Sequence, residues 1–349
     1  MLTYSLKVEN ITRETDDAIT VSFKQPALKK VKYLAGQYLT LIFKINGRRY
    51  IRPYSFSSAP GVDSTLDITI KRVAGGIVSN HIFDKVKIGD IVEVYKPLGD
   101  FVIDKVPGEL QNKRIVLWGS GSGITPLMSL SKYVLNTGCC KHVTLVYGNR
   151  SFETTIFSEK LLEMQKQYHD SFSVWHFHTK GIVLDSSPYV VQGRIDPEIV
   201  WDVISHESDI NDTVHFICGA VGLKESVKKT LLKFGIKNEV VFSEDFEVMR
   251  NPADFKDIIT QNVNLTVNNQ TTLLEVIKGK SILEAGLDAG MDLAYSCQTG
   301  NCKLCKATIK SGDIKVIGVD VRQEELAENE CLLCCSFPLN GEVSLAVEI

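Results

Sequence analysis

Cysteines near one end of the sequence have the type and spacing to hold an inorganic redox centre. Six of the nine cysteines lie there, at Cys297, Cys302, Cys305, Cys331, Cys334 and Cys335. The first three form a Cys-x4-Cys-x2-Cys motif, which with one distant thiolate suits a [2Fe-2S] cluster, because ligands in one short loop can hold one iron and reach the other. A zinc ribbon would pair two Cys-x2-Cys knuckles, and the first cysteine here lies too far forward. The motif therefore predicts a one-electron carrier.

The fourth ligand has to come from the distant cysteines. Neighbouring residues of an extended chain point to opposite faces, so Cys334 and Cys335 are not both expected to face the cluster. The segment 332–338 resembles the closing strand of plant-type ferredoxins, in which the ligand stands four residues before a proline. That resemblance selects Cys334 and leaves Cys331 and Cys335 as ordinary buried thiols.

The sequence before the cysteine loop predicts the elements that support it. Two strands are expected at 263–267 and 272–276, and Ser281 with Glu284 forms a capping-box pattern at the start of a short helix. Gly300, between the first two cysteines, allows a tight turn in which backbone amides can point at sulfur. Together these features predict a ferredoxin fold.

Composition limits the class of protein. The 349 residues, 44% hydrophobic and 23% charged, are typical of a globular protein with two or three domains. A formal net charge of -3, without a dense run of lysine or arginine, argues against nucleic acid or a membrane as a partner. The first residues lack the apolar run of a signal peptide, and no window reaches the length of a membrane span. An odd number of cysteines favours a reducing compartment, so we expect a cytoplasmic protein.

The first hundred residues predict a small antiparallel barrel. Short alternating strands separated by turn residues are expected at 6–11, 18–23, 38–45, 66–73 and 91–95, with one short helix near 79–84. Within this region lie Arg52, Tyr54 and Ser55. An arginine can neutralise a diphosphate, a tyrosine ring can stack on a flat cofactor and a serine can bond its edge. A strand with an exposed polar face is the alternative interpretation.

A second element strengthens the cofactor interpretation. The stretch 71–80 places a glycine pair directly before a helix start, where free amides suit a diphosphate. These two elements, with the later Lys-Pro-Leu-Gly-Asp-Phe at 96–101, resemble the FAD domain of the ferredoxin-NADP reductase superfamily. The resemblance implies that Arg52, Tyr54 and Ser55 hold the flavin ring and phosphate, and that residues 76–79 hold the diphosphate. The residues assigned to this second element are Lys71, Gly75, Gly76, Val78 and Ser79.

Strands and helices alternate in the middle of the chain, as in a Rossmann-like α/β domain. A buried-type strand at 114–118 is followed by a turn with Gly121, Gly123 and Thr125, and then by an apolar helix with Pro126 in its first turn. Glycines there let a diphosphate approach the helix N-terminus. The turn lacks the G-x-G-x-x-G spacing of the common dinucleotide fingerprint, so its assignment depends on the order of the elements, which resembles the superfamily's pyridine-nucleotide domain.

The end of the next strand favours one nucleotide over another. Arg150 and Ser151 follow the strand expected at 143–149, where a ribose and its 2'-phosphate would lie. An arginine and a serine could bind that phosphate, which favours NADPH as the donor, with NADH possible. A solvated arginine at a strand end is the alternative interpretation.

Two later stretches complete the expected nucleotide and flavin contacts. Cys218 and Gly219 resemble the family's Cys-Gly-Pro strand end beside the nicotinamide, with Ala220 in place of the usual proline. That departure puts the rigidity of the loop in question. The stretch 240–246 closes the domain where the family often places residues against the flavin, and we assign Phe246 to that role.

Two other groupings of metal-binding residue types are not assigned a site. His176 and His178 alternate on an expected strand and so share a face, but no third ligand lies nearby in the sequence. Cys139 and Cys140 follow a glycine in a loop and cannot easily act as a redox pair. Both pairs are interpreted as incidental.

The order of the three parts resembles the reductase components of bacterial oxygenases over nearly the whole chain. We therefore expect a multi-domain protein with an antiparallel β-barrel FAD domain at 1–108, an α/β Rossmann-like NAD(P)-binding domain at 109–247, a linker at 248–261 and an α+β β-grasp [2Fe-2S] ferredoxin domain at 262–349. The resemblance implies hydride transfer from NADPH to FAD, then single-electron transfer through the cluster to an oxygenase or another metalloprotein acceptor. No acid or base residue is required for the hydride step, which depends on positioning.

Other functions stay open at this point. One is a stand-alone NAD(P)H diaphorase or ferredoxin-type reductase, and another is a redox sensor. A third is an electron-transfer protein with a decayed nucleotide site, for which Ala220 is the one hint. Rapid bleaching of the flavin by NADPH would exclude the decayed site.

Overall fold

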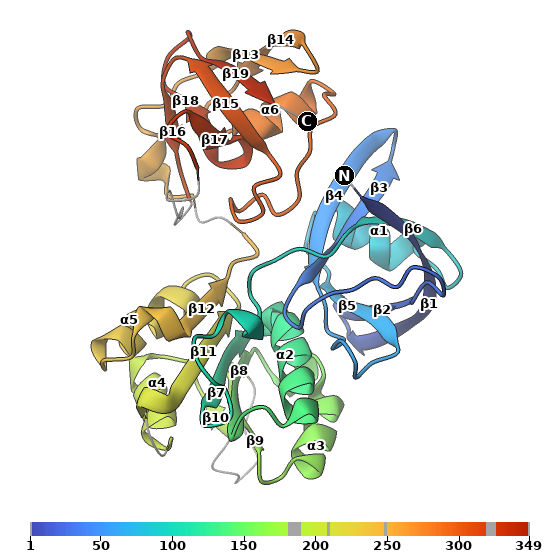
Figure 1. Cartoon of the computed structure of the whole chain (residues 1–349), viewed down its shortest axis with the longest axis vertical. Coiled ribbons are helices and arrows are strands. Elements are labelled where there is room, and N and C mark those ends of the chain that lie inside the picture. Colours follow the sequence, from blue (N-terminus) through green and yellow to red (C-terminus); the bar gives the residue numbers. More distant parts are fainter. Residues whose placement is uncertain (1, 181–189, 208–209, 248–249, 319–325, 348–349) are drawn as a thin grey trace. The chain divides into compact units, whose positions relative to one another are not determined.

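The computed structural model of the protein describes all residues except 1, 181–189, 208–209, 248–249, 319–325 and 348–349 (Figure 1). The chain forms two compact units. One contains Met1–Phe43 and Pro53–Glu244, and the other contains Lys44–Arg52 and Asp245–Ile349. The short segment Lys44–Arg52 is therefore grouped with the C-terminal third of the chain rather than with its neighbours in sequence.

An antiparallel sheet occupies the N-terminal part of the chain. Its strands are β1 (Thr3–Thr15), β2 (Ala18–Lys24), β3 (Tyr38–Ile45), β4 (Arg48–Ser55), β5 (Thr65–Lys71) and β6 (Ile91–Tyr95). The strand order is β4-β3-β6-β1-β2-β5, and an isolated bridge joins Phe56, directly after β4, to Ile68 of β5. Because this bridge links the two outer strands, the sheet closes as the sequence predicted. The expected short helix is α1 (Ile77–Lys85), and η1 (Ile103–Lys105) ends the region.

A parallel sheet follows within the same unit. Its strands are β7 (Arg114–Ser120), β8 (His142–Asn149), β9 (Phe172–His178), β10 (Val190–Gln192), β11 (Thr213–Cys218) and β12 (Val241–Glu244). The helices are α2 (Ile124–Thr137), α3 (Ser158–Gln167), α4 (Pro197–Ser205) and α5 (Leu223–Lys233), with 3-10 turns η2 (Gly121–Gly123), η3 (Phe152–Thr154), η4 (Ile210–Asp212) and η5 (Asn238–Val240). Every strand pair in this sheet is parallel.

Both faces of the parallel sheet are buried, which explains the unbroken apolar run in β7. Ile115 and Leu117 belong to a core cluster that includes residues of α2 and α3. Val116 and Trp118, on the other face, belong to a cluster that includes residues of α4 and α5. Side chains alternate between the faces of a strand, so a strand covered on both sides needs an apolar residue at every position.

The strand order of the parallel sheet creates a place for a ligand. The order is β10-β9-β8-β7-β11-β12, so the chain runs outward from β7 in one direction and then resumes at β11 on the other side. In open α/β sheets the ligand crevice lies outside the carboxyl ends of the two strands where the order reverses. Here those strands are β7 and β11.

The C-terminal unit contains a mixed sheet packed on one helix. The sheet has the order β14-β13-β19-β15-β17, and only the β13–β19 pair is parallel among the pairs described. Its strands are β13 (Gln261–Val267), β14 (Gln270–Val276), β15 (Lys306–Ser311), β17 (Glu330–Leu332) and β19 (Ser344–Val347). The remaining elements are α6 (Ile282–Asp288), the pair β16 (Ile314–Val316) and β18 (Ser336–Pro338), and the turns η6 (Pro252–Phe255) and η8 (Leu333–Cys335). The predicted capping box at Ser281 and Glu284 is confirmed.

Candidate functional site

The end of β4 meets the end of β12. Ser55 is buried, and its hydroxyl donates to the carboxylate of Glu244 at an Oγ–Oε2 distance of 3.4 Å. Glu244 ends β12 and lies in register with Cys218 of β11, which in turn lies in register with Gly119 of β7. Glu244 therefore bonds the residue predicted for the flavin and lies on the strand beside the residue predicted for the nicotinamide, at the reversal point of the sheet. Sequence reasoning did not assign Glu244.

Three other predicted flavin contacts lie in both units: Tyr54 belongs to the first, and Arg52 and Phe246 belong to the second. Arg52 and Tyr54 are half-buried, and the Arg52 guanidinium donates to the carbonyl oxygen of Ile51 at 2.8 Å. Phe246 is 42% exposed. All three stay predicted flavin contacts.

The glycine pair before α1 has the geometry of a cradle. Gly76 is the N-cap of α1, and a Cβ atom there would lie 2.6 Å from the Ser79 hydroxyl oxygen. The Ser79 hydroxyl accepts a hydrogen bond from the amide of Val73, which fixes the loop on the helix. Gly75 has a φ of 71°, in the left-handed region that favours glycine. Open amides of this helix start and the missing side chains fit a diphosphate.

Two further residues of this stretch have other partners. Lys71 lies at the end of β5, and its ammonium pairs with Asp17 at 3.4 Å. Val78 is buried, so it contributes to packing of α1. Both residues stay predicted cofactor contacts.

The turn after β7 packs against the end of β11 without space for side chains. A Cβ atom on Gly123 would lie 2.1 Å from the carbonyl oxygen of Cys218 and 2.5 Å from the Cα atom of Gly219. The Ser120 hydroxyl accepts a hydrogen bond from the amide of Ala220 at 2.7 Å. The two loops predicted to bind the pyridine nucleotide are thus joined directly, and the bond at Ala220 supplies some of the rigidity that a proline would provide.

The same turn leads into α2 as predicted. Gly121 has a φ of 52°, and the Thr125 hydroxyl donates to the carbonyl oxygen of Ser122 at 2.7 Å. Pro126 lies in the first turn of α2. A buried donor, Nδ2 of Asn149 at the end of β8, has no hydrogen-bond partner among the described residues. Such an unsatisfied donor near the carboxyl edge of the sheet fits a polar ligand.

The tip after β8 carries charges of both signs. Ser151 caps η3, where its amide donates to the Thr154 hydroxyl at 3.1 Å. Its own hydroxyl donates to the Glu153 carboxylate, which lowers the pKa of Glu153. Arg150 is exposed beside it. A carboxylate therefore shares the region predicted for a 2'-phosphate, a feature that sequence reasoning missed.

The cysteine loop directs backbone amides at sulfur. The Cys297 sulfur accepts hydrogen bonds from the amides of Thr299 and Cys302, at 3.4 Å and 3.3 Å. Gly300 has a φ of 83°, which allows this turn. The Cys302 thiol also donates to Cys297, and these hydrogen bonds lower the pKa of Cys297 despite its burial. A sulfur that several donors stabilise as thiolate is suited to bind iron.

The closing segment differs from the extended strand that the sequence predicted. Leu333–Cys335 form the 3-10 turn η8, and the amide of Leu333 donates to the carbonyl oxygen of Cys305 at 2.9 Å. In a 3-10 turn adjacent side chains are not forced to opposite faces, and the sulfurs of Cys334 and Cys335 are 3.4 Å apart. The assumption of an extended chain at this point was wrong. The Cys305 thiol nevertheless donates a hydrogen bond to Cys334, and this hydrogen bond together with burial raises the pKa of Cys305.

The thiols are arranged as two pairs. Cys297 lies with Cys302, and Cys305 lies with Cys334. Among the described residues, no three Cys, His, Asp or Glu side chains surround one point as ligands of a single metal ion would. A [2Fe-2S] cluster held by four cysteines takes two thiolates per iron, so two pairs fit a dinuclear cluster better than a lone ion. Burial raises the pKa of the nearby Cys331 to about 11, as expected for an ordinary buried thiol.

The two histidines and the two adjacent cysteines that the sequence analysis interpreted as incidental have local contacts. The rings of His176 and His178 lie 6.2 Å apart, and the Nε2 atom of His178 lies 3.4 Å from the Thr155 hydroxyl. Cys139 and Cys140 are half-buried free thiols after α2. No third metal-binding side chain joins either pair within the described part of the chain.

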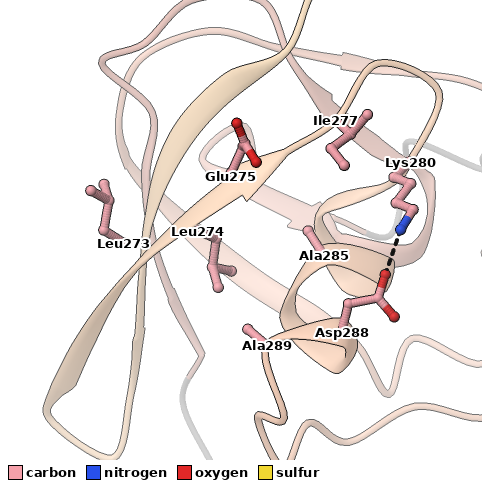
Figure 2. A pocket seen from close by; sticks show the side chains of 8 residues that line it. All are labelled: Leu273, Leu274, Glu275, Ile277, Lys280, Ala285, Asp288 and Ala289. Atoms are coloured by element: carbon pink, nitrogen blue, oxygen red, sulfur yellow. Dashed lines mark hydrogen bonds and ion pairs between the residues drawn. The ribbon is translucent and has the colours of Figure 1, made fainter.

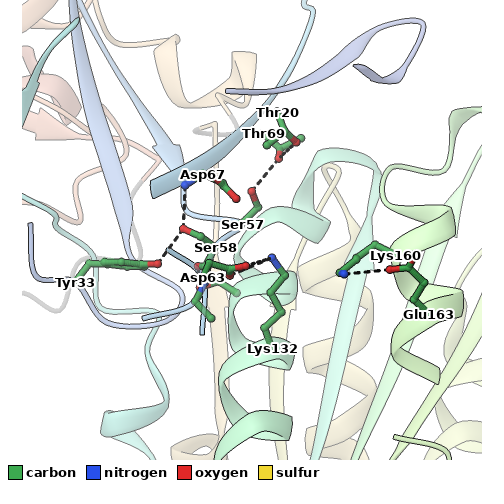
Figure 3. Close-up of polar contacts among 12 residues, drawn as sticks. Thr20, Tyr33, Ser57, Ser58, Asp63, Asp67, Thr69, Lys132, Lys160 and Glu163 are labelled. Atoms are coloured by element: carbon green, nitrogen blue, oxygen red, sulfur yellow. Dashed lines mark hydrogen bonds and ion pairs between the residues drawn. The ribbon is translucent and has the colours of Figure 1, made fainter. Parts of the chain in front are cut away.

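Buried polar contacts join the barrel to the nucleotide sheet within the first unit (Figure 3). The Ser129 hydroxyl of α2 donates to the carbonyl oxygen of Ser58 at 2.6 Å, and the Ser58 hydroxyl bonds the Tyr33 hydroxyl at 2.9 Å. Lys132, one turn further along α2, pairs with Asp63 at 3.1 Å. These contacts hold the segment directly after the Arg-Pro-Tyr-Ser motif against α2.

Three family models match successive parts of the chain. They are an oxidoreductase FAD-binding domain over residues 5–103, an oxidoreductase NAD-binding domain over 117–229 and a 2Fe-2S iron-sulfur cluster binding domain over 265–339. The chain is an NAD(P)H-dependent oxidoreductase with FAD-binding, NAD-binding and 2Fe-2S domains. The cofactors of this reductase are FAD, NAD(P)H and a [2Fe-2S] cluster, as the sequence predicted.

Relatives match nearly the whole length of the chain. The ferredoxin reductase component of 3-ketosteroid-9-alpha-monooxygenase from Mycobacterium tuberculosis is 28% identical, with 98% of this chain and 95% of the relative covered. A component of the 1,2-phenylacetyl-CoA epoxidase from Escherichia coli K12 is 28% identical, with 97% and 96% covered. The structure of phthalate dioxygenase reductase has the same fold, with a TM-score of 0.68 over 99% of this chain and 98% of that chain at 22% identity.

The described helices also bear on membrane association. None of them is both long enough and apolar enough to cross a bilayer. The longest, α2, has 14 residues, which is short of the roughly 20 that a span requires.

Proposed function

We propose that this reductase takes electrons from NADPH and delivers them to a partner oxygenase. The observation that carries the proposal is the convergence of Ser55, Glu244 and Cys218 at the reversal point of the parallel sheet. There the predicted flavin and nicotinamide residues lie together within one unit, as hydride transfer requires. The names of relatives support an oxygenase as acceptor, since they are components of oxygenase and epoxidase systems.

The residues of this chain act by holding and orienting. Bound FAD can accept electrons in pairs from a pyridine nucleotide and release them singly to an iron-sulfur cluster. The start of α1 at Gly76 and the turn at Gly123 would each bind a diphosphate through backbone amides. Ser55 and Glu244 would fix the edge of the ring at which the two cofactors meet. Cys297, Cys302, Cys305 and Cys334 would hold the cluster.

NADH is the second candidate donor, and one observation favours it. Arg150 offers a positive charge for a 2'-phosphate, but the ionised Glu153 next to it repels phosphate and can accept from ribose hydroxyls. We expect Arg150→Ala to raise the KM for NADPH by about tenfold, the value of one charge-assisted hydrogen bond, and to leave that for NADH unchanged. Glu153→Gln is the matched control and should lower the KM for NADPH. Faster flavin reduction by NADH in the unaltered protein would reverse the assignment.

A more specific acceptor is proposed from the resemblance of short sequence segments to those of one known reductase. Segments such as 36–40 and 147–151 look like those of the phenylacetyl-CoA epoxidase reductase, so that epoxidase is the first partner to test. The experiment is anaerobic reduction of the purified protein by each nucleotide, followed by transfer to the oxidised epoxidase. Reduction without transfer to any oxygenase would favour a stand-alone diaphorase or a redox sensor.

Domain limits and a cellular location complete the proposal. We propose the domain limits 1–108, 109–247, 248–261 and 262–349, and a cytoplasmic location. The odd number of cysteines, nine in all, supports a reducing compartment.

A further inference from the structure

Cys335 is a buried thiol directly beside the predicted fourth cluster ligand. The residue is 1% exposed, and its sulfur lies 3.4 Å from the sulfur of Cys334. Both residues belong to the turn η8, in which adjacent side chains are not forced to opposite faces. The proposed function assigns no role to the Cys335 thiol.

Contacts on both sides of this turn hold Cys335 in place. The carbonyl oxygen of Cys335 accepts a hydrogen bond from the amide of Ile317 at 3.0 Å, and the amide of Leu333 donates to the carbonyl oxygen of Cys305 at 2.9 Å. Phe337, two residues after Cys335, belongs to a small apolar core cluster that also includes Ile317. The turn is therefore anchored at both ends, and its two sulfur atoms are held together by the fold.

The contact between the two sulfur atoms is shielded from water. Helix α6 packs against both η8 and β14. A pocket of about 230 Å³ lies where α6 faces β14, and its lining residues all lie between Leu273 and Ala289 (Figure 2). The pocket therefore does not open onto Cys334 or Cys335, both of which are buried. A hydrogen bond in such surroundings is stronger than the same bond in water.

The direction of this hydrogen bond follows from the role of Cys334. A cysteine binds iron as a thiolate, which can accept a hydrogen bond but has no proton to donate. The predicted set of four ligands is complete without Cys335, so the hydrogen between the two sulfur atoms belongs to Cys335.

We propose that Cys335 donates an S–H···S hydrogen bond to the Cys334 sulfur and thereby raises the reduction potential of the cluster. Reduction adds negative charge that is shared with the ligand sulfurs, and a donor stabilises the more negative state more strongly. Cys335 therefore acts through Cys334, as a residue that tunes the electron carrier. The inference rests on the proposed role of Cys334 as a ligand, and it does not depend on the nucleotide or on the acceptor.

The reduction potential of the cluster in Cys335→Ala tests the proposal. It is measured in the full, cofactor-loaded protein by a redox titration that follows the paramagnetic resonance signal of the reduced cluster. Loss of one hydrogen bond should favour the oxidised cluster about fivefold, which is a potential about 40 mV lower, because tenfold corresponds to 59 mV for one electron. Cys335→Ser keeps a donor at this position and should restore the potential of the unaltered protein.

Cys331→Ala is the matched control, because it removes a second buried thiol from the same segment. Cys331 lies on β17, opposite Ala307 and before the turn η8. This variant should keep both the cluster and its potential.

Infrared spectroscopy of the unaltered protein detects the donated hydrogen directly, whether or not Cys335→Ala folds. The S–H stretching band of Cys335, identified by its loss in Cys335→Ser, should move to lower frequency when the cluster is reduced. The proposal is overturned if this band is the same in both oxidation states, or if Cys335→Ala keeps its cluster at the unaltered potential. Loss of iron and sulfide from Cys335→Ser, with retention in Cys334→Ser, would overturn the ligand assignment and this proposal together. Both measurements are made with a chemical reductant, so they are independent of the nucleotide and of an oxygenase.

Discussion

One methyl group added at Gly123 should slow the reduction of the flavin by the nucleotide and leave the flavin and iron content unchanged. In Gly123→Ala the new Cβ would lie 2.1 Å from the Cys218 carbonyl oxygen, whereas an ordinary contact begins at 3.4 Å. The neighbouring atoms are backbone, so a rotamer change cannot relieve the clash. The end of β11 would therefore have to retreat by about an ångström, at a cost of roughly 1–3 kcal/mol for overpacking.

This displacement should act on the hydride step more than on folding. Cys218 lies in register with Glu244, whose carboxylate bonds Ser55, so a shift of β11 moves the nucleotide side of the site relative to the flavin side. A misplacement of about 1 Å lowers the rate of a positioned reaction by roughly 100-fold. The assay is anaerobic stopped-flow reduction of the flavin by NADPH and NADH. Flavin and iron content should match the unaltered protein.

Gly148→Ala is the control for this prediction. A Cβ there would lie 3.4 Å from the Ile195 side chain, an ordinary contact, so the rate of flavin reduction should stay within about twofold. If Gly123→Ala fails to fold, Gly219→Ala tests the same junction from the other strand, where a Cβ would meet the Ser120 hydroxyl oxygen at 2.4 Å. A folded, fully loaded Gly123→Ala protein that reduces its flavin at the original rate would refute the reasoning.

Three further predictions concern single groups. Cys334→Ser should lose the cluster absorbance, iron and sulfide, whereas Cys335→Ser should keep them; the reverse pattern would reassign the fourth ligand. Glu244→Gln should slow flavin reduction about tenfold, the value of one hydrogen bond of Ser55 to a charged group, and an unchanged rate would remove Glu244 from the site. Burial lowers the pKa of His215 to about 3, below the 6.5 of an unfolded chain, so the unfolded state binds the proton first and stability falls as pH drops below 6.5. The free energy of unfolding should be about 2 kcal/mol lower at pH 5 than at pH 7 from this group, measured by urea titration with tryptophan fluorescence, and His215→Gln should flatten that dependence.

Local features of the sequence predicted local features of the structure. The capping box at Ser281 and the turn at Gly300 each depend on residues within a few positions, and both are present. The strands of the two sheets were also predictable, because their burial follows the period of the pattern. The cysteine spacing was informative for the same reason, because three of the predicted ligands lie within one short loop.

Contacts between distant residues were not predictable in this way. Ser55 and Glu244 lie 189 positions apart, and nothing in either local pattern requires them to meet. The 3-10 turn at Leu333–Cys335 was missed because a short apolar run is also compatible with a strand, and the bond from Leu333 to Cys305 that fixes it is not visible in the sequence. The ion pairs of Arg48 with Asp288 and of Arg49 with Asp292 were not predictable either, because an Asn-Gly pair specifies a tight turn but not the residues that the turn contacts.

The contacts that hold each part of the chain match what that part has to do. A hydride step needs sub-ångström positioning, and the barrel is joined to α2 by the buried bond from Ser129 to Ser58 and by the Lys132–Asp63 pair, whose side chains are only 14% and 24% exposed. Burial of these contacts is therefore expected to keep the barrel and α2 in one fixed arrangement.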